Sequence, residues 1–160
     1  MRTLLLLRHA KSDWDDEGLT DHERPLSERG KREAPRVGQH LLERQLRPDL
    51  ILCSTAKRTQ KTARKVLKAS GWEVPVKYLN ELYLTDADTY LNVLRHHSDD
   101  ARCVLVIGHN PCLESILYAL VNYRSAFPTA ALAQLELAID DWQQVSRQSP
   151  AQLISLWRPE

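Results

Sequence analysis

Three short apolar runs constrain the fold of this chain more than any other feature of its sequence. They are Leu4 to Leu7, Leu50 to Cys53 and Cys103 to Ile107, and each is bounded by polar or turn-forming residues. Runs of this length without polar alternation are typical of strands that are buried on both faces of a parallel sheet. Helical patterns separate the runs. This alternation predicts a three-layer α/β/α fold with a mostly parallel central sheet.

Four helix starts are predicted from cap signals and apolar periodicity, near Ser27, Ala56, Thr85 and Asn110. Thr85 and Asp88 have the spacing of a capping box, and Asn110 precedes a proline that suits a first helical turn. The second helix carries a basic run, which we interpret as a solvated face.

Three further strands are expected outside the apolar runs. A weak candidate covers Val74 to Tyr78, and two later ones cover Leu132 to Ile139 and Gln152 to Trp157. The last two are joined by a polar loop. We expect them to lie together at one side of the sheet.

The size and composition of the chain fit one domain over residues 1–160. Of these residues 42% are hydrophobic, which is enough for a single core. The 22 basic and 21 acidic side chains nearly cancel, so no bulk charge indicates nucleic acid or an anionic membrane as a partner. Binding of phosphate must therefore depend on a local cluster of cationic side chains.

The expected location of the protein is the cytoplasm. The apolar run near the start is ended by Arg8 too soon for an export signal, and no later run is long enough for a membrane span. Cys53, Cys103 and Cys112 are odd in number and lie in or beside apolar runs. These positions favour reduced, buried thiols over a disulfide framework.

Polar residues follow three of the predicted strands at the points where they end. Arg8 and His9 end the first, the segment from Ser54 to Arg58 ends the second, and a Gly-His-Asn-Pro segment containing His109 ends the third. Ligands of open parallel sheets bind outside the carboxyl ends of the strands, so these side chains can meet in one crevice. Arginine holds two phosphoryl oxygens at once, and helix starts attract anions. The pattern predicts a phosphate site.

These motifs resemble the histidine phosphatase superfamily, also called the phosphoglycerate-mutase-like family. In chain order they are Leu7-Arg8-His9-Ala10, Arg24-Pro25-Leu26-Ser27-Glu28-Arg29-Gly30, Ser54-Thr55-Ala56-Lys57-Arg58-Thr59 with Thr62-Ala63, and Gly108-His109-Asn110-Pro111. The compact size is most similar to the SixA-type phosphohistidine phosphatases. The resemblance implies the phosphoglycerate-mutase-like fold and phosphatase activity through a covalent phosphohistidine.

The resemblance also implies a role for each matching residue. His9 is expected to be the nucleophile, while Arg8, Arg58 and His109 bind the phosphoryl group and stabilise its charge. Larger family members use a carboxylate as general acid, and Glu81 is the positional candidate for that role. A leaving imidazole needs less help from an acid than an alkoxide does.

Two neighbouring residues could extend the site. Lys11 and Ser12 could reach the phosphate from the loop after His9, and Ser12 is the candidate for phosphate binding, but the pattern favours a solvated loop for both. His96 and His97 have the chemistry of metal ligands, but we interpret them as an exposed helix end.

No metal ion and no organic cofactor are expected, because the arginines supply the charge that magnesium supplies in kinases. The expected partner is a phosphorylated protein, such as a histidine-containing phosphotransfer domain, or a small phosphorylated substrate.

Three other functions fit parts of the pattern. A mutase or phosphomonoesterase for small metabolites would need more chain to enclose its substrate. A non-catalytic module that binds phosphate or phosphohistidine would gain little from an unprotonated imidazole. A cysteine-based phosphatase is excluded, because Cys53 and Arg58 enclose four residues, one fewer than the loop of that family.

Overall fold

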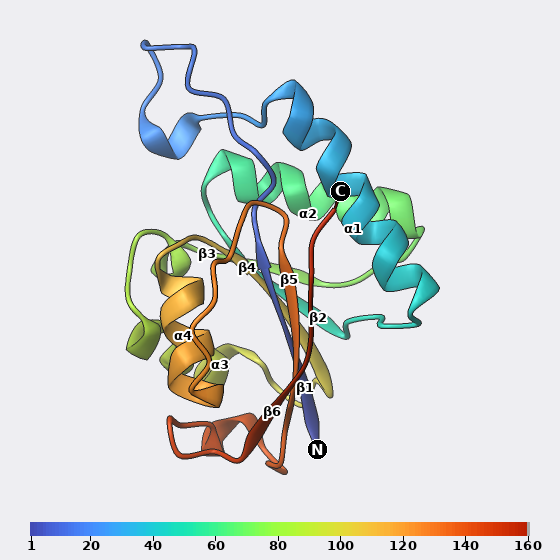
Figure 1. Cartoon of the computed structure of the whole chain (residues 1–160), viewed down its shortest axis with the longest axis vertical. Helices are drawn as coiled ribbons and strands as arrows, with labels where there is room; N and C mark the ends of the chain where they lie inside the picture. The colour runs from blue at the N-terminus through green and yellow to red at the C-terminus, as the bar shows by residue number, and fades with distance from the viewer. Residues whose placement is uncertain (160) are drawn as a thin grey trace.

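The computed structural model describes residues 1–159, whose six strands form one sheet in the order β3-β2-β4-β1-β5-β6 (Figure 1). Strands β1 to β4 are parallel to one another, whereas β5 pairs antiparallel with both β1 and β6. The mostly parallel α/β fold predicted from the sequence is therefore confirmed. The strands span Arg2–Arg8 (β1), Leu50–Ser54 (β2), Val76–Leu79 (β3), Cys103–Gly108 (β4), Leu132–Leu137 (β5) and Ala151–Trp157 (β6).

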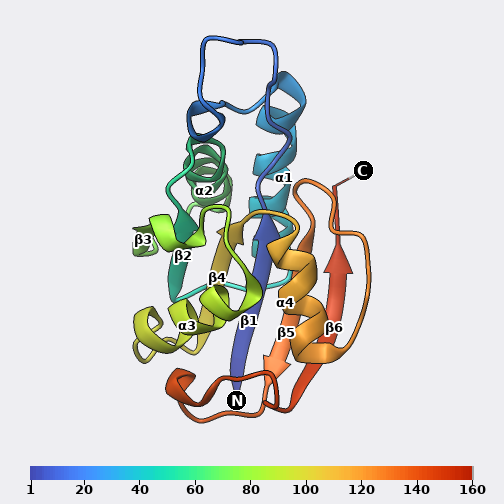
Figure 2. The same cartoon turned by 90° about the vertical axis from the view of Figure 1, so that its left-hand side faces the viewer.

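Helices cover both faces of the sheet, as Figures 1 and 2 show. Helices α1 and α2 lie against one face, and α3 and α4 lie against the other. The helices span Glu28–Glu43 (α1), Lys57–Ser70 (α2), Ala87–His97 (α3) and Cys112–Val121 (α4), with single 3-10 turns at Asp21–Glu23, Asn80–Leu82 and Trp142–Gln144. No helix among residues 1–159 is long and apolar enough to cross a membrane.

The apolar runs are continuous because each strand serves two cores. Along β1, Leu4 and Leu6 face α3 and α4, whereas Leu5 and Leu7 face α1 and α2. All four side chains are fully buried. Successive side chains of a strand point to opposite faces, so a strand covered on both sides has no place for polar residues.

Two of the predicted helix starts need correction. Helix α3 is capped by Asp86, whose carboxylate accepts a hydrogen bond from the backbone N–H of Thr89, rather than by Thr85. Helix α4 begins after Pro111, and Asn110 does not cap it. The Asn110 amide instead donates to the carboxylate of Glu114 and to a backbone carbonyl, because its side chain is turned toward the neighbouring loop.

The long segment between β1 and α1 stands beyond the carboxyl end of β1 (Figure 2). A single bridge between Ser12 and Leu26 ties its two ends together. The first turn of α1 then packs closely against this segment. A Cβ atom placed on Gly30 would lie 2.0 Å from the backbone oxygen of Lys11, so only glycine fits there. This contact fixes the loop that follows His9.

Candidate active site

A cleft of about 280 Å³ lies at the carboxyl ends of β1 and β4. It collects side chains from the ends of these strands, from the loop after β1 and from the start of α2. Its lining residues are Arg8, His9, Lys11, Ser12, Trp14, Asp21, Arg24, Arg58, Leu84, His109, Asn110 and Thr129. The structure thus brings together the adjacent Arg8 and His9 with Arg58 and His109, which come from two distant parts of the sequence.

His9 is buried, and its ring is held in one orientation. Its Nδ1 atom lies 2.7 Å from the backbone oxygen of Ala10. The Ala10 peptide is itself fixed, because its N–H donates to the Thr62 hydroxyl. A carbonyl oxygen only accepts hydrogen bonds, so Nδ1 carries the proton and the lone pair of the neutral ring lies on Nε2.

Burial keeps the His9 imidazole neutral. Loss of hydration is the main reason that its pKa falls from 6.5 to about 3, and the positive charges of Arg58 and Arg8 lower this pKa further. The hydrogen bond to Ala10 opposes the shift without reversing it. His9 therefore presents an unprotonated nitrogen at any physiological pH.

His109 lies beside His9, with 5.2 Å between the ring centroids. Its Nε2 atom is 2.8 Å from the Ser54 hydroxyl oxygen, and its Nδ1 faces Nη2 of Arg58 at 3.4 Å. Because a guanidinium only donates, Nδ1 is the acceptor and Nε2 carries the proton. Burial, followed by nearby positive charge, lowers the pKa of His109 to about 3.

The backbone around His109 is positioned by Tyr90. The Tyr90 hydroxyl accepts a hydrogen bond from the His109 N–H and donates to the carbonyl of Leu82. A Cβ atom on Gly108 would lie 2.1 Å from this hydroxyl, which explains why glycine precedes His109. Together these contacts hold the end of β4 against α3.

Arg8 and Arg58 supply positive charge to the cleft. Arg58 is 4% exposed, and it donates to the backbone oxygen and to the carboxylate of Asp21. Arg8 donates from one nitrogen to the backbone oxygen of Phe127, and its Nε is buried without a partner among residues 1–159. Arg8 therefore keeps donors that an anion in the cleft can use.

Asp21 is a cleft residue that the sequence analysis missed. Its carboxylate accepts hydrogen bonds from Arg24 at 2.7 Å, Arg58 at 3.1 Å and the Tyr83 hydroxyl at 2.6 Å. These partners hold the pKa of Asp21 well below its usual range, against the opposing effect of burial. Asp21 is therefore an ionised anion, and the loop that carries it shows no motif that could have revealed it.

Ser12 and Arg24 form the outer wall of the cleft. Ser12 is buried and accepts a close hydrogen bond from Arg24, so its hydroxyl is engaged by the protein itself. The guanidinium of Arg24 also stacks on the Trp14 ring, 3.1 Å from the ring centroid, and Trp14 is mostly exposed. Arg24 begins the second of the four sequence motifs, but its place in the cleft was not predicted.

The structure does not bring Glu81 into the cleft. The Glu81 carboxylate is half exposed and lies 3.7 Å from Nε2 of His97. It belongs to the 3-10 turn after β3, which directs its side chain toward the end of α3. Among the described residues no group of three or more histidine, cysteine or acidic side chains could hold a metal ion.

The histidine phosphatase superfamily (branch 1) is the family whose model matches this chain, over residues 4–90. The matched stretch is more than half of the 160 residues and includes His9 and Arg58, while His109 follows it. The chain therefore belongs to this superfamily and is a phosphatase enzyme.

Solved structures with the same fold cover almost the whole chain. A candidate phosphohistidine phosphatase SixA from Agrobacterium tumefaciens is 32% identical, with a TM-score of 0.85, and the match covers 99% of this chain and 98% of that one. A second candidate SixA protein, from Nakamurella multipartitia, is 31% identical with a TM-score of 0.83, over 99% of this chain and 96% of that one.

Sequence relatives extend the comparison. An uncharacterized protein of Mycobacterium leprae (strain TN) is 33% identical over 96% of this chain and 99% of its own length. A 2,3-bisphosphoglycerate-dependent phosphoglycerate mutase of Thermobifida fusca (strain YX) is 43% identical, but over only 48% of this chain and 32% of its own length.

Proposed function

We propose that the chain is a phosphohistidine phosphatase of the SixA type, which accepts the phosphoryl group on Nε2 of His9 and then transfers it to water. The observation that carries this proposal is the 2.7 Å hydrogen bond between His9 Nδ1 and the Ala10 carbonyl. This bond leaves the lone pair on Nε2, which accepts no hydrogen bond from residues 1–159. A neutral, oriented imidazole surrounded by cations is what nucleophilic attack on a phosphoryl group requires.

In the first step, Nε2 of His9 attacks phosphorus, and the bond between phosphorus and the departing nitrogen of the substrate breaks. Arg8 and Arg58 offset the charge that spreads over the three equatorial oxygens. The negative charge of the bound group raises the pKa of His109, so that Nδ1 takes up a proton from solvent and its N–H then donates a hydrogen bond to a phosphoryl oxygen. Water then attacks phosphorus, the bond to His9 breaks, and inorganic phosphate leaves.

The carboxylates near the cleft favour a leaving group that needs no acid. Asp21 is the single carboxylate in the cleft lining within the described part of the chain, and its lowered pKa leaves it ionised at neutral pH. The Glu81 carboxylate faces His97, and the Glu114 carboxylate accepts a hydrogen bond from Asn110. A departing imidazole can take its proton from solvent at its other ring nitrogen, whereas an alkoxide needs a nearby acid. Phosphohistidine therefore suits this cleft better than a sugar phosphate.

The relatives support the same assignment. The two candidate SixA structures match this chain end to end, whereas the mutase of Thermobifida fusca matches about half of it. Cys53, Cys103 and Cys112 are free thiols. We therefore propose that the enzyme works in the reducing cytoplasm, on a phosphorylated protein.

A direct comparison of substrates tests the proposal. We expect purified enzyme to hydrolyse a phosphohistidine peptide with a kcat/KM at least about a hundredfold above that of glucose 6-phosphate or 3-phosphoglycerate, because only the esters need an acid. Activity should survive a chelator. Faster hydrolysis of either ester would overturn the assignment in favour of a metabolite phosphatase. Phosphate binding without any turnover would instead indicate a non-catalytic module that binds phosphate.

The His9→Ala and Arg58→Ala variants separate chemistry from binding. We expect His9→Ala to lose turnover and to keep part of its affinity for inorganic phosphate, because the arginines remain. Arg58→Ala should weaken both. Isothermal titration with phosphate and steady-state kinetics measure the two effects. Residual turnover in His9→Ala above that of the uncatalysed reaction would contradict a nucleophilic role.

A further inference from the structure

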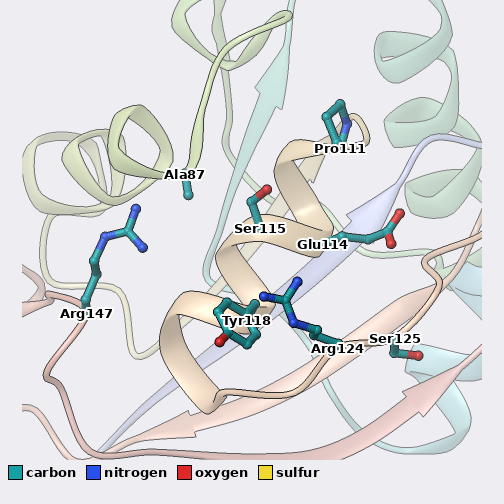
Figure 3. Close-up of a pocket in the computed structure, with 8 residues that line it drawn as sticks. All are labelled: Ala87, Pro111, Glu114, Ser115, Tyr118, Arg124, Ser125 and Arg147. Atoms are coloured by element: carbon teal, nitrogen blue, oxygen red, sulfur yellow. The ribbon is translucent and has the colours of Figure 1, made fainter.

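A second hollow, larger than the catalytic cleft, lies outside that cleft. It has a volume of about 420 Å³ and runs along the outer side of α4, with Ala87 and Arg147 on one side of the helix and Arg124 and Ser125 on the other (Figure 3). Figure 3 shows Arg124 and Arg147 entering this hollow from different sides of α4, while Ser115 points into it from the helix. Neither arginine has a role in the chemistry described above.

The hollow adjoins the catalytic cleft. Pro111 lines the hollow and Asn110 lines the cleft, and Asn110 donates to the carboxylate of Glu114, a second lining residue of the hollow, at 2.7 Å. Pro111 and Tyr118 are separated by seven positions of the chain, or about 10 Å along a helix. A peptide whose phosphohistidine enters the cleft can therefore reach this hollow within about three to five extended residues.

Arg124 gives the hollow an available positive charge. Its guanidinium lies 4.0 Å from the centroid of the Tyr118 ring, which holds the cation in place. No carboxylate among residues 1–159 forms an ion pair with Arg124, whereas Arg147 is paired with Asp88 at 2.9 Å. The guanidinium of Arg124 therefore keeps hydrogen-bond donors for a carboxylate from outside the protein.

The rim of the hollow is partly apolar. Tyr118, which lines the hollow and contacts Arg124, is 38% exposed. An exposed aromatic ring beside an arginine without an ion pair is typical of protein interfaces.

We propose that this hollow, which is lined by Arg124 and Tyr118, binds an acidic segment of the protein that carries the phosphohistidine. The proposal rests on the proposed function, and it explains how a nearly neutral enzyme selects one phosphoprotein among many. The protein carries a formal net charge of +1, so long-range attraction is weak and a local cation has to supply the preference.

The test uses two phosphohistidine peptides of equal length. One carries glutamates at three to five positions on either side of the phosphohistidine, and the other carries glutamines there. We expect the acidic peptide to show a kcat/KM about tenfold above that of the glutamine peptide with the unaltered enzyme, mainly through KM. In Arg124→Glu the preference should disappear or reverse, and in Arg124→Lys it should largely remain.

Two controls make the outcome specific. Arg64→Glu places the same charge change on the exposed side of α2, and it should leave the preference unchanged. Turnover of phosphoramidate, which is too small to reach the hollow, should be equal in all variants. Equal kcat/KM for the two peptides with the unaltered enzyme would overturn the docking proposal while leaving the proposed function intact. Hydrolysis of phosphoramidate but of neither peptide would overturn both.

Discussion

Acidification should destabilise this protein through the two buried imidazoles of the cleft. In the folded state the pKa values of His9 and His109 are lowered to about 3, while in the unfolded chain both return to the usual value of 6.5. Between these values the unfolded chain binds more protons than the folded one. The stabilisation is therefore complete above pH 6.5 and is lost progressively as the pH falls toward 3.

The size of this loss of stability follows from the pKa of each imidazole in the folded and in the unfolded state. For one imidazole whose pKa falls from 6.5 to about 3, going from about pH 7.5 to about pH 5 removes about 2 kcal/mol of the free energy of unfolding. Two such groups remove about 4 kcal/mol, a large part of the ~5–15 kcal/mol typical of a domain. Asp21 contributes little in this window, because its pKa is lowered from 3.8 and its effect begins below that value.

Urea unfolding at several pH values measures the loss, and His9→Gln identifies its source. Glutamine does not titrate, so the variant should lose about 2 kcal/mol less than the unaltered protein between about pH 7.5 and about pH 5. His40, whose pKa is also lowered by burial, contributes equally to both proteins. Equal pH dependence of the two proteins would refute the reasoning, as would a His9 ring resonance that titrates near 6.5.

Three further substitutions test individual contacts. Glu81→Gln should change kcat/KM on a phosphohistidine peptide by less than about twofold, because Glu81 faces His97, and a loss of about a hundredfold would restore it as general acid. Asp21→Asn should lower the inhibition constant of inorganic phosphate about tenfold, because it removes the negative charge beside Arg58. A higher inhibition constant would show that Asp21 serves mainly to order Arg58. Gly30→Ala should lower the free energy of unfolding in urea by about 2 kcal/mol or more, because its Cβ would meet the Lys11 carbonyl. The control Gly18→Ala, in an open loop, should lower it little. Equal effects of the two substitutions would contradict the packing at Gly30.

The sheet was predictable because its strands carry an unambiguous pattern. Leu4 to Leu7 lacks polar residues since both faces of β1 are covered, and the strand ends mark where Arg8 and His9 must emerge. Parallel strands bring these ends to one edge, so the meeting of His9 with His109 followed from the order of the elements. The geometry of the four cleft residues could be anticipated for that reason.

The remaining features of the site depend on contacts that a sequence pattern does not encode. Asp21 reaches the cleft through a long segment, whose path is set by the bridge between Ser12 and Leu26 and by the contact at Gly30. Glu81 was named as general acid from its position in the chain alone, but the direction of its side chain depends on the 3-10 turn that holds it. Asn110 is a residue type that often caps helices. Its side-chain amide donates instead to the Glu114 carboxylate and to the Phe127 carbonyl, which are tertiary contacts that a sequence pattern does not show.

Phosphorylation of His9 is the central claim, and rapid quenching of the enzyme during turnover tests it most directly. Mixing the enzyme with phosphohistidine peptide, quenching in alkali and digesting under alkaline conditions preserves phosphate bound to an imidazole. Mass spectrometry of the fragments should then locate the phosphoryl group on His9 during turnover and on no residue of His9→Ala. A phosphoryl group on His109 or on Cys53, or turnover without any phosphorylated enzyme, would contradict the account.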